Sequence, residues 1–331
     1  MKRLSKKLLA LTMAVLLLVP ALLSSCAKKP DEALEIKIYA LNGTTALGMA
    51  QMIHNAKNDA DTMNYNISLH ASADAITGAI TTGECAIAAL PTNVAAKLYK
   101  ASAGKLQLLA LNTLGVLYLL DGEGTVSKME DLRGKTVYLP GAGSNPEFIT
   151  AALLESANLK VGTDVMLDTT SYPSPDALQT ALTSGAISLA VLPEPKVTVV
   201  TTAKPAVKVA LNLTAEWEKL NGENTLVQGC LVVNTAFAKE HPAELAQFLA
   251  DYKASVEFIS AGSEEAINMI VDAGILPKAA IAKKALPNCN LCYIAGEDMK
   301  PVMKVFCEKL FALNPASVGA VPDDGFYYIA K

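Results

Sequence analysis

Two stretches of the chain, residues 72–91 and 174–193, repeat one pattern without a gap. The first reads SADAITGAITTGECAIAALP and the second reads SPDALQTALTSGAISLAVLP, with identical Ser, Asp, Ala, Thr, Gly, Leu and Pro at corresponding positions. Each copy predicts a helix that ends at a glycine, followed by a short apolar strand of the kind found in buried parallel sheets. The repeat favours two lobes of related design, although two βαβ units that converged on one pattern would give the same architecture.

Strand-like and helix-like segments alternate through most of the chain. The pattern predicts strands at residues 35–41, 66–71, 85–90, 106–111, 135–139, 165–169 and 187–192. Helices are predicted between them at 44–57, 74–82, 92–102, 146–157 and 174–185. Beyond residue 225 the pattern predicts helices at 242–261, 263–273, 278–285 and 299–313, with strands at 226–233 and 290–295. Such alternation predicts an α/β protein with mostly parallel sheets and helices on both faces.

The length of 331 residues exceeds what one hydrophobic core usually supports, so two lobes are expected. We expect lobe I to comprise residues 34–118 and 224–331, and lobe II to comprise residues 119–223. Two crossings of the chain, near residues 118–121 and 222–225, would then form a hinge.

The N-terminal residues have the features of an export signal. Lys2, Arg3, Lys6 and Lys7 precede an apolar run over residues 8–23, which is too short for a stable membrane span. The sequence Leu-Ser-Ser-Cys that ends at Cys26 resembles a bacterial lipobox. We therefore expect a signal peptide over 1–25, a lipid on Cys26 and a polar tether over 26–33. An ordinary signal peptide with an incidental cysteine is the alternative, and the membrane that would hold the anchor is left open.

Charge and cysteine content narrow the function classes. Loss of residues 1–25 removes four basic residues and no acidic one, which moves the formal charge from −4 to −8. This balance lacks the clustered basic face that nucleic-acid binding requires. The cysteines after Cys26 are Cys85, Cys230, Cys289, Cys292 and Cys307. The CxxC pair at 289 and 292 has no second ligand pair or nearby histidine, so structural thiols, free or disulfide-bonded, are favoured over a metal or redox site.

Several segments taken in order resemble one family. They read LNGTTALG at 41–48, ALPTNVA at 89–95, DLRGKTV at 131–137, GAGSNPE at 141–147 and LPEP at 192–195. Together with the lipobox they resemble solute-binding proteins of ABC transporters, of the nitrate/sulfonate/taurine and thiamine-precursor (NMT1/THI5-like) type. The resemblance implies a two-lobe periplasmic-binding-protein type II fold with a ligand cleft between the lobes. It also implies an ABC permease and ATPase as partners, a monomer, and no cofactor.

Loops that follow the predicted strands are the candidate ligand site, because ligands of open α/β sheets bind beyond the carboxyl ends of the strands. The candidates are Asn42, Gly43, Thr44, Thr45, Pro91, Thr92, Asn93, Gly143, Ser144, Asn145 and Glu194, with Asn112 and Gln228 near the presumed hinge. Helix capping is the alternative role for the threonines. The 141–145 loop departs from the dinucleotide-binding pattern at Pro146. A carboxylate at 194 would favour a cationic or N–H-rich ligand if it faces the cleft, and a loop charge in solvent is its alternative. Trp217 and Tyr172 are candidates for stacking on a flat ligand, with core or surface packing favoured for each.

A binding protein is favoured over two other classes. The sequence contains no HExxH or GxSxG motif, and its histidines, His54, His70 and His241, are scattered. An enzyme on the same fold, similar to menaquinone- or pyrimidine-pathway proteins, and a ligand-sensing receptor lipoprotein are the alternatives. The cargo is left open between neutral or singly charged heterocycles, sulfonates and other small anions.

Overall fold

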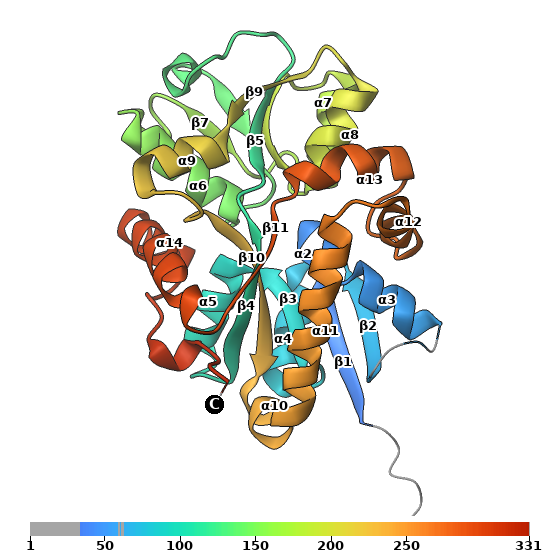
Figure 1. Cartoon of the computed structure of the whole chain (residues 1–331). Helices are drawn as coiled ribbons and strands as arrows, with labels where there is room; N and C mark the ends of the chain where they lie inside the picture. The colour runs from blue at the N-terminus through green and yellow to red at the C-terminus, as the bar shows by residue number, and fades with distance from the viewer. Residues whose placement is uncertain (1–33, 59, 61–62, 331) are drawn as a thin grey trace, which may run out of the picture. The chain divides into compact units, whose positions relative to one another are not determined.

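The computed structural model describes residues 34–58, 60 and 63–330 (Figure 1). The expected signal peptide, the expected lipid site at Cys26 and the tether lie outside these residues. Within the described part of the chain, no helix has the length and apolar character needed to cross a bilayer.

The strands of the described residues form two sheets. The strand order of one is β11-β4-β10-β3-β1-β2 and of the other β7-β6-β8-β5-β9. The strands of the first sheet are β1 (Glu35–Leu41), β2 (Asn64–His70), β3 (Ile87–Pro91), β4 (Leu106–Leu114), β10 (Val227–Asn234) and β11 (Leu291–Ala295). Those of the second are β5 (Leu117–Asp121), β6 (Thr136–Tyr138), β7 (Met166–Asp168), β8 (Leu189–Pro193) and β9 (Lys208–Asn212). We call the parts of the chain built on these sheets lobe I and lobe II.

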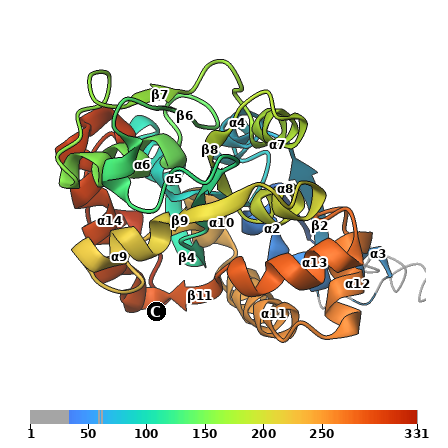
Figure 2. The same cartoon turned by 90° about the horizontal axis from the view of Figure 1, so that it is seen from above.

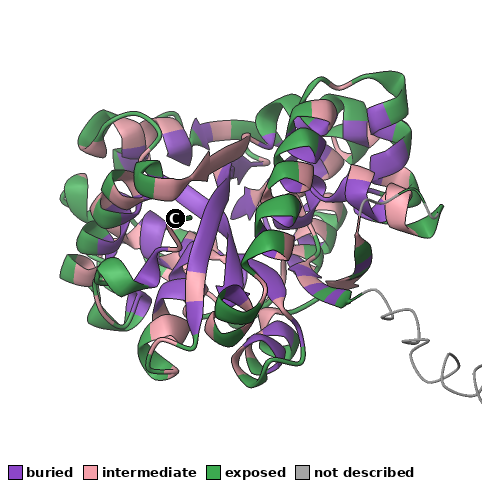
Figure 3. Ribbon diagram, turned by 60° about the horizontal axis from the view of Figure 1, so that its bottom comes forward, coloured by how far each residue is buried: buried purple, intermediate pink, exposed green. Residues whose placement is uncertain are grey.

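Helices cover both sheets, and their side chains are buried on the faces that meet the strands (Figure 3). They are α2 (Thr44–Leu47), α3 (Ala50–Lys57), α4 (Ala73–Thr82), α5 (Thr92–Ala101), α6 (Asn145–Ser156), α7 (Pro175–Ser184), α8 (Lys196–Ala203), α9 (Leu213–Asn221), α10 (Thr235–Glu240), α11 (Pro242–Ser260), α12 (Glu264–Asp272), α13 (Ala279–Ala285) and α14 (Met299–Leu313). Helix α13 lies beside α8 of lobe II (Figure 2).

Apart from β11 at its edge, the first sheet has the same arrangement of strands as the second. β1 pairs in parallel with β2 and β3, and β6 pairs in parallel with β7 and β8. β10 is antiparallel to β3 and β4, as β5 is to β8 and β9. β11 is also antiparallel to β4. The sheets are therefore mixed, whereas the sequence predicted mostly parallel sheets, because the alternation of strands and helices does not reveal the direction of β5, β10 and β11.

The sequence repeat corresponds to equivalent elements of the two lobes. Helix α4 ends at Gly83 and α7 at Gly185, and both glycines adopt the left-handed conformation, with φ of 82° and 85°. Each helix is followed by a buried apolar strand, β3 or β8. The predicted α/β architecture is confirmed, and the repeat places equivalent loops at the ends of β3 and β8.

One predicted helix is interrupted. The helix expected over 44–57 is divided into α2 and α3, with Gly48 between them. A Cβ at Gly48 would lie 2.6 Å from the Tyr252 hydroxyl oxygen and 2.8 Å from Val256 Cγ2. The break therefore follows from the close packing of α11 on this segment, which apolar spacing alone does not reveal.

The crossings between the sheets are short. β4 ends at Leu114 and β5 begins at Leu117, so the expected lobe boundary after residue 118 falls inside β5. Gln228 Oε1 accepts a hydrogen bond from the backbone N–H of Val116 at 2.6 Å, and Asn290 donates to the carbonyl of Gly115. The return crossing lies between α9 and β10, where the expected boundary at 223/224 also falls.

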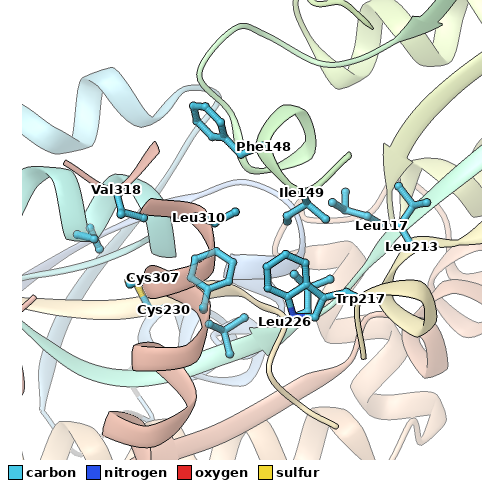
Figure 4. Packing of buried hydrophobic residues seen from close by; sticks show 14 of the residues in the cluster. Leu117, Phe148, Ile149, Leu213, Trp217, Leu226, Cys230, Cys307, Leu310 and Val318 are labelled. Atoms are coloured by element: carbon cyan, nitrogen blue, oxygen red, sulfur yellow. The ribbon is translucent and has the colours of Figure 1, made fainter. Parts of the chain in front are cut away.

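An apolar cluster extends across both lobes. It includes Leu108 and Val232 from the first sheet and Leu119 and Val191 from the second. Helix α14 joins the two parts, and Figure 4 shows its Cys307 beside Cys230 of β10 and Trp217 of lobe II near Leu226. The two lobes therefore share this cluster, while further buried clusters belong to lobe I and to lobe II alone.

The cysteines of the described residues are unpaired thiols. Burial raises the pKa of Cys85, Cys292 and Cys307 to about 12, which disfavours the reactive thiolate. Cys292 lies in β11, as the sequence predicted for the CxxC segment. No group of three or more metal-ligating side chains occurs in the part of the chain that the structure describes.

The turn after β5 allows a test of folding energetics. Burial alone would raise the pKa of Asp121, but its carboxylate accepts hydrogen bonds from the N–H groups of Glu123, Gly124, Thr125 and Val126, which hold the pKa below its usual value. We predict that Asp121→Ala lowers the free energy of unfolding by roughly 2 kcal/mol at pH 7, because these donors lose their acceptor.

The contribution of the Asp121 carboxylate to the free energy of unfolding should depend on pH. The pKa of Asp121 is lower in the folded state than its unfolded value of about 3.9, so the ionised carboxylate stabilises the fold when the pH is above that unfolded pKa. This contribution is lost as the pH falls through the folded-state pKa. Urea denaturation at pH 7 and pH 3 should show a smaller difference between wild type and Asp121→Ala at pH 3. Asp121→Asn, which keeps one acceptor, should be intermediate at pH 7. An equal difference at both pH values would contradict the role of the ionised carboxylate.

Candidate functional site

A cavity of about 440 Å³ lies between the lobes, at the carboxyl ends of β1, β3 and β8. All the predicted ligand residues except Thr92 and Asn112 line it. These are Asn42, Gly43, Thr44, Thr45, Pro91, Asn93, Gly143, Ser144, Asn145, Glu194 and Gln228. The repeat-related loops after β3 and β8 both contribute, so strand polarity alone brings together residues that are far apart in sequence.

Several helices begin at this cavity. The first residues or cap residues of α4, α5, α6, α7 and α8 are all part of its wall. The first N–H groups of a helix have no partner within the helix, and the helix dipole places a partial positive charge there. Polar groups of a ligand in this cavity could therefore accept hydrogen bonds from those backbone N–H groups that have no partner within the protein.

The 141–145 loop of lobe II is held by side chains from both lobes. Its Gly143 N–H donates to Glu147 Oε2 at 2.5 Å. The Gly143 carbonyl accepts from Asn93 Nδ2 at 3.3 Å and from Lys97 Nζ at 3.4 Å, and both of these residues belong to α5 of lobe I. The loop is thus one point at which the two lobes are joined by hydrogen bonds.

Lys97 is a residue of this site that the sequence analysis missed. Its ammonium group lies 5.3 Å from the centre of the Phe148 ring, in addition to its contact with Gly143. Desolvation lowers the pKa of Lys97, and the nearby Glu147 opposes this shift. The available signal was its position four residues after Asn93, which places both side chains on one face of α5.

Thr92 and Asn112 lie behind the cavity wall. The Thr92 hydroxyl donates to the Val227 carbonyl at 2.6 Å and accepts from Asn145 Nδ2 at 3.3 Å. Asn112 Nδ2 donates to the carbonyl of Thr45 at 3.0 Å. Both are buried, so in this structure they hold lining residues in position.

Glu194 is not a solvent-exposed loop charge, because it is only 3% exposed. Its two carboxylate oxygens accept hydrogen bonds from the backbone N–H and the hydroxyl of Thr198, at 3.0 and 2.9 Å. Burial raises the pKa of Glu194, while these bonds and the charge of Lys284 oppose the rise. Its carboxylate therefore caps the start of α8.

The two aromatic candidates lie outside the cavity lining. Trp217 is 1% exposed, and the centre of its ring system lies 6.1 Å from the centre of the Phe306 ring. Its indole N–H donates a hydrogen bond to the Thr225 hydroxyl. Tyr172 packs edge-on against Tyr138. Core packing, the favoured interpretation for Trp217, is confirmed.

Thr92 provides a test of this interlobe wall. We predict that Thr92→Val lowers the free energy of unfolding by about 1–3 kcal/mol, because the Val227 carbonyl and one Asn145 donor lose a buried partner while the side-chain volume is kept. Urea denaturation measures the change. Thr180→Val is the control, since the Thr180 hydroxyl is exposed and bonds only within α7. Equal effects of the two substitutions would contradict the special role of Thr92.

Residues 104–266 match the model of the NMT1/THI5 like family. No curated protein sequence matches the chain.

Solved structures share the fold at low identity. An ABC transporter protein from Parabacteroides distasonis has a TM-score of 0.74 and 21% identity, covering 89% of this chain and 99% of its own. The periplasmic aliphatic sulphonate binding protein from Escherichia coli has a TM-score of 0.73 and 14% identity, covering 90% and 92%. The periplasmic nitrate-binding protein from Synechocystis has a TM-score of 0.58 and 11% identity, covering 81% and 75%. Residues 104–266 are therefore similar to the NMT1/THI5 like family, and the chain has the type II fold of periplasmic binding proteins.

Proposed function

We propose that this protein is the extracytoplasmic solute-binding component of an ABC importer, which captures a small organic molecule or anion by closure of its lobes. The observation that supports this most directly is the cavity between the lobes, whose wall comes from both sides of the hinge crossings. A ligand in such a cavity contacts both lobes at once, so it binds the closed state better than an open state.

The interlobe hydrogen bonds give closure a physical basis. Asn93 and Lys97 of lobe I reach Gly143, and Asn145 of lobe II reaches Thr92. These bonds surround the cavity and form only when the lobes meet. Ligand contacts and interlobe contacts would therefore stabilise the same state.

Export of the protein and its assembly with a membrane transporter are also part of the proposed function. A lipid on Cys26 would anchor the protein outside the cell, and the closed monomer would dock on an ABC permease powered by an ATPase. Two of the structural neighbours named above are a sulphonate-binding and a nitrate-binding protein, which disfavours the enzyme alternative. Turnover of a bound compound would restore that alternative.

The test is a ligand screen with a conformational readout. Purified protein is exposed to vitamins, amino acids, nucleobases, nitrate and sulfonates, and thermal stability and small-angle X-ray scattering are measured. A ligand should raise Tm and reduce the radius of gyration. The single tryptophan, Trp217, contacts Phe306 of α14 and should report the rearrangement through its fluorescence. Absence of binding across the screen would count against a solute-binding role.

Lys97 allows a test of closure at a distance from the ligand. We predict that Lys97→Met weakens binding of a screened ligand about five- to tenfold, because the closed state loses the contact with Gly143, at roughly 1 kcal/mol. Lys100→Met, an exposed lysine of the same helix, is the control and should bind normally. Calorimetric titration measures both. Equal affinity of Lys97→Met and wild type would show that this contact does not contribute to closure.

A further inference from the structure

We propose that Asn42 is a site of spontaneous deamidation in the folded protein, where the reaction converts a neutral residue of the interlobe cavity wall into an anionic one. The reacting pair is Asn42 and the glycine that follows it, Gly43. This inference concerns the chemistry of the chain itself, so it does not depend on the proposed transport role.

Two Asn-Gly dipeptides occur in the chain, at residues 42–43 and 221–222. An asparagine is most open to attack by the next backbone nitrogen when glycine follows it, because glycine has no side chain to obstruct the approach and adopts many backbone conformations. The dipeptides alone therefore indicate two sites of equal reactivity. Their surroundings in the fold distinguish them.

The reaction requires water as its only co-reactant. The backbone nitrogen of Gly43 gives up its proton to a solvent base and forms a bond to Asn42 Cγ, and the side-chain nitrogen of Asn42 leaves as ammonia. Water then opens the imide ring at either of its carbonyl groups, which yields aspartate or isoaspartate. Each event consumes one water, releases one ammonia and involves no oxidation or reduction.

The pair at 42–43 is open to this reaction. Asn42 is exposed, and neither its side-chain amide nor the N–H of Gly43 has a hydrogen-bond partner among the residues that the structure describes. Gly43 has φ 121° and ψ −148°, which is a conformation essentially confined to glycine. A Cβ at Gly43 would meet nothing within 4 Å. The attacking nitrogen and the amide carbon are therefore both free, with space around them for the ring.

The pair at 221–222 is held by the last turn of α9. The N–H of Gly222 donates to the Glu218 carbonyl at 2.9 Å, and Asn221 Nδ2 donates to the Trp217 carbonyl at 3.1 Å. Trp217 is buried, so this turn is fixed to the core. Both hydrogen bonds must break before the Gly222 nitrogen can attack Asn221, which slows deamidation there by about tenfold or more.

Deamidation of Asn42 would change the cavity wall in two ways. A carboxylate would replace a neutral amide in a wall that already includes Asp74 and Glu194. The isoaspartate product would also add a carbon to the backbone between β1 and α2, and so displace Thr44 and Thr45 of the same wall. An aged preparation of the protein would therefore contain chemically different forms of the cavity.

Peptide mapping of the folded protein tests this inference. The purified full-length protein is incubated at pH 8 for several days, and digested samples are analysed by mass spectrometry for the mass increase that replacement of the amide NH₂ by OH produces. Chromatography separates the aspartate and isoaspartate peptides. A parallel incubation in guanidinium chloride gives the rates at both sites without the fold.

In the folded protein, Asn42 should deamidate about tenfold or more faster than Asn221, because only the Asn221 pair is held by hydrogen bonds. In guanidinium chloride the two rates should approach each other. Equal rates in the folded protein would overturn the inference, as would an Asn42 that folding protects as strongly as Asn221.

Matched substitutions check which residue reacts in the intact protein. Ion-exchange chromatography of the incubated wild type should show an acidic species that increases with time. Asn42→Gln should remove most of this species, because the longer glutamine side chain closes a ring much more slowly. Asn221→Gln is the control and should leave the acidic species unchanged. Full accumulation of the acidic species in Asn42→Gln would contradict the assignment to Asn42.

Discussion

The direction of the parallel strands is the constraint on which the site depends. Since β1, β3 and β8 all end at the space between the lobes, the loops that follow them and the helices that start there must share one wall. Backbone groups at those helix starts need partners from outside the helix. The protein meets part of this need internally, since Glu147 accepts from the N–H of Gly143 and Glu194 accepts from that of Thr198.

The first crossing of the proposed hinge is held by specific contacts, which a simple flexible linker would lack. The first crossing is confined to the residues between β4 and β5, and Gln228 and Asn290 bind its backbone from lobe I. A Cβ at Gly115 would lie 2.3 Å from Thr214 Cγ2, so a glycine is required for this close approach. If the lobes rotate, the crossing about which they do so is held by hydrogen bonds and close packing.

Sequence patterns predicted the architecture and several of the loops that line the cavity, because both follow from periodicity and strand direction. The repeat led directly to the equivalent positions of Pro91 and Pro193, and the loop at Gly143 was found from its place before a helix. The partner of each side chain was not predictable in the same way. Lys97 was missed, and the carboxylate of Glu194 turned out to cap α8, because these roles depend on contacts between segments distant in sequence.

The continuous apolar cluster behind the hinge has a consequence for how the molecule comes apart. Helix α14 packs against α6 of lobe II and β10 of lobe I, so each lobe shares one apolar cluster with the other in addition to the cluster that it has of its own. The lobes are distinct in topology but belong to one cooperative unit, and a segment cut at the hinge would lack part of its own interior.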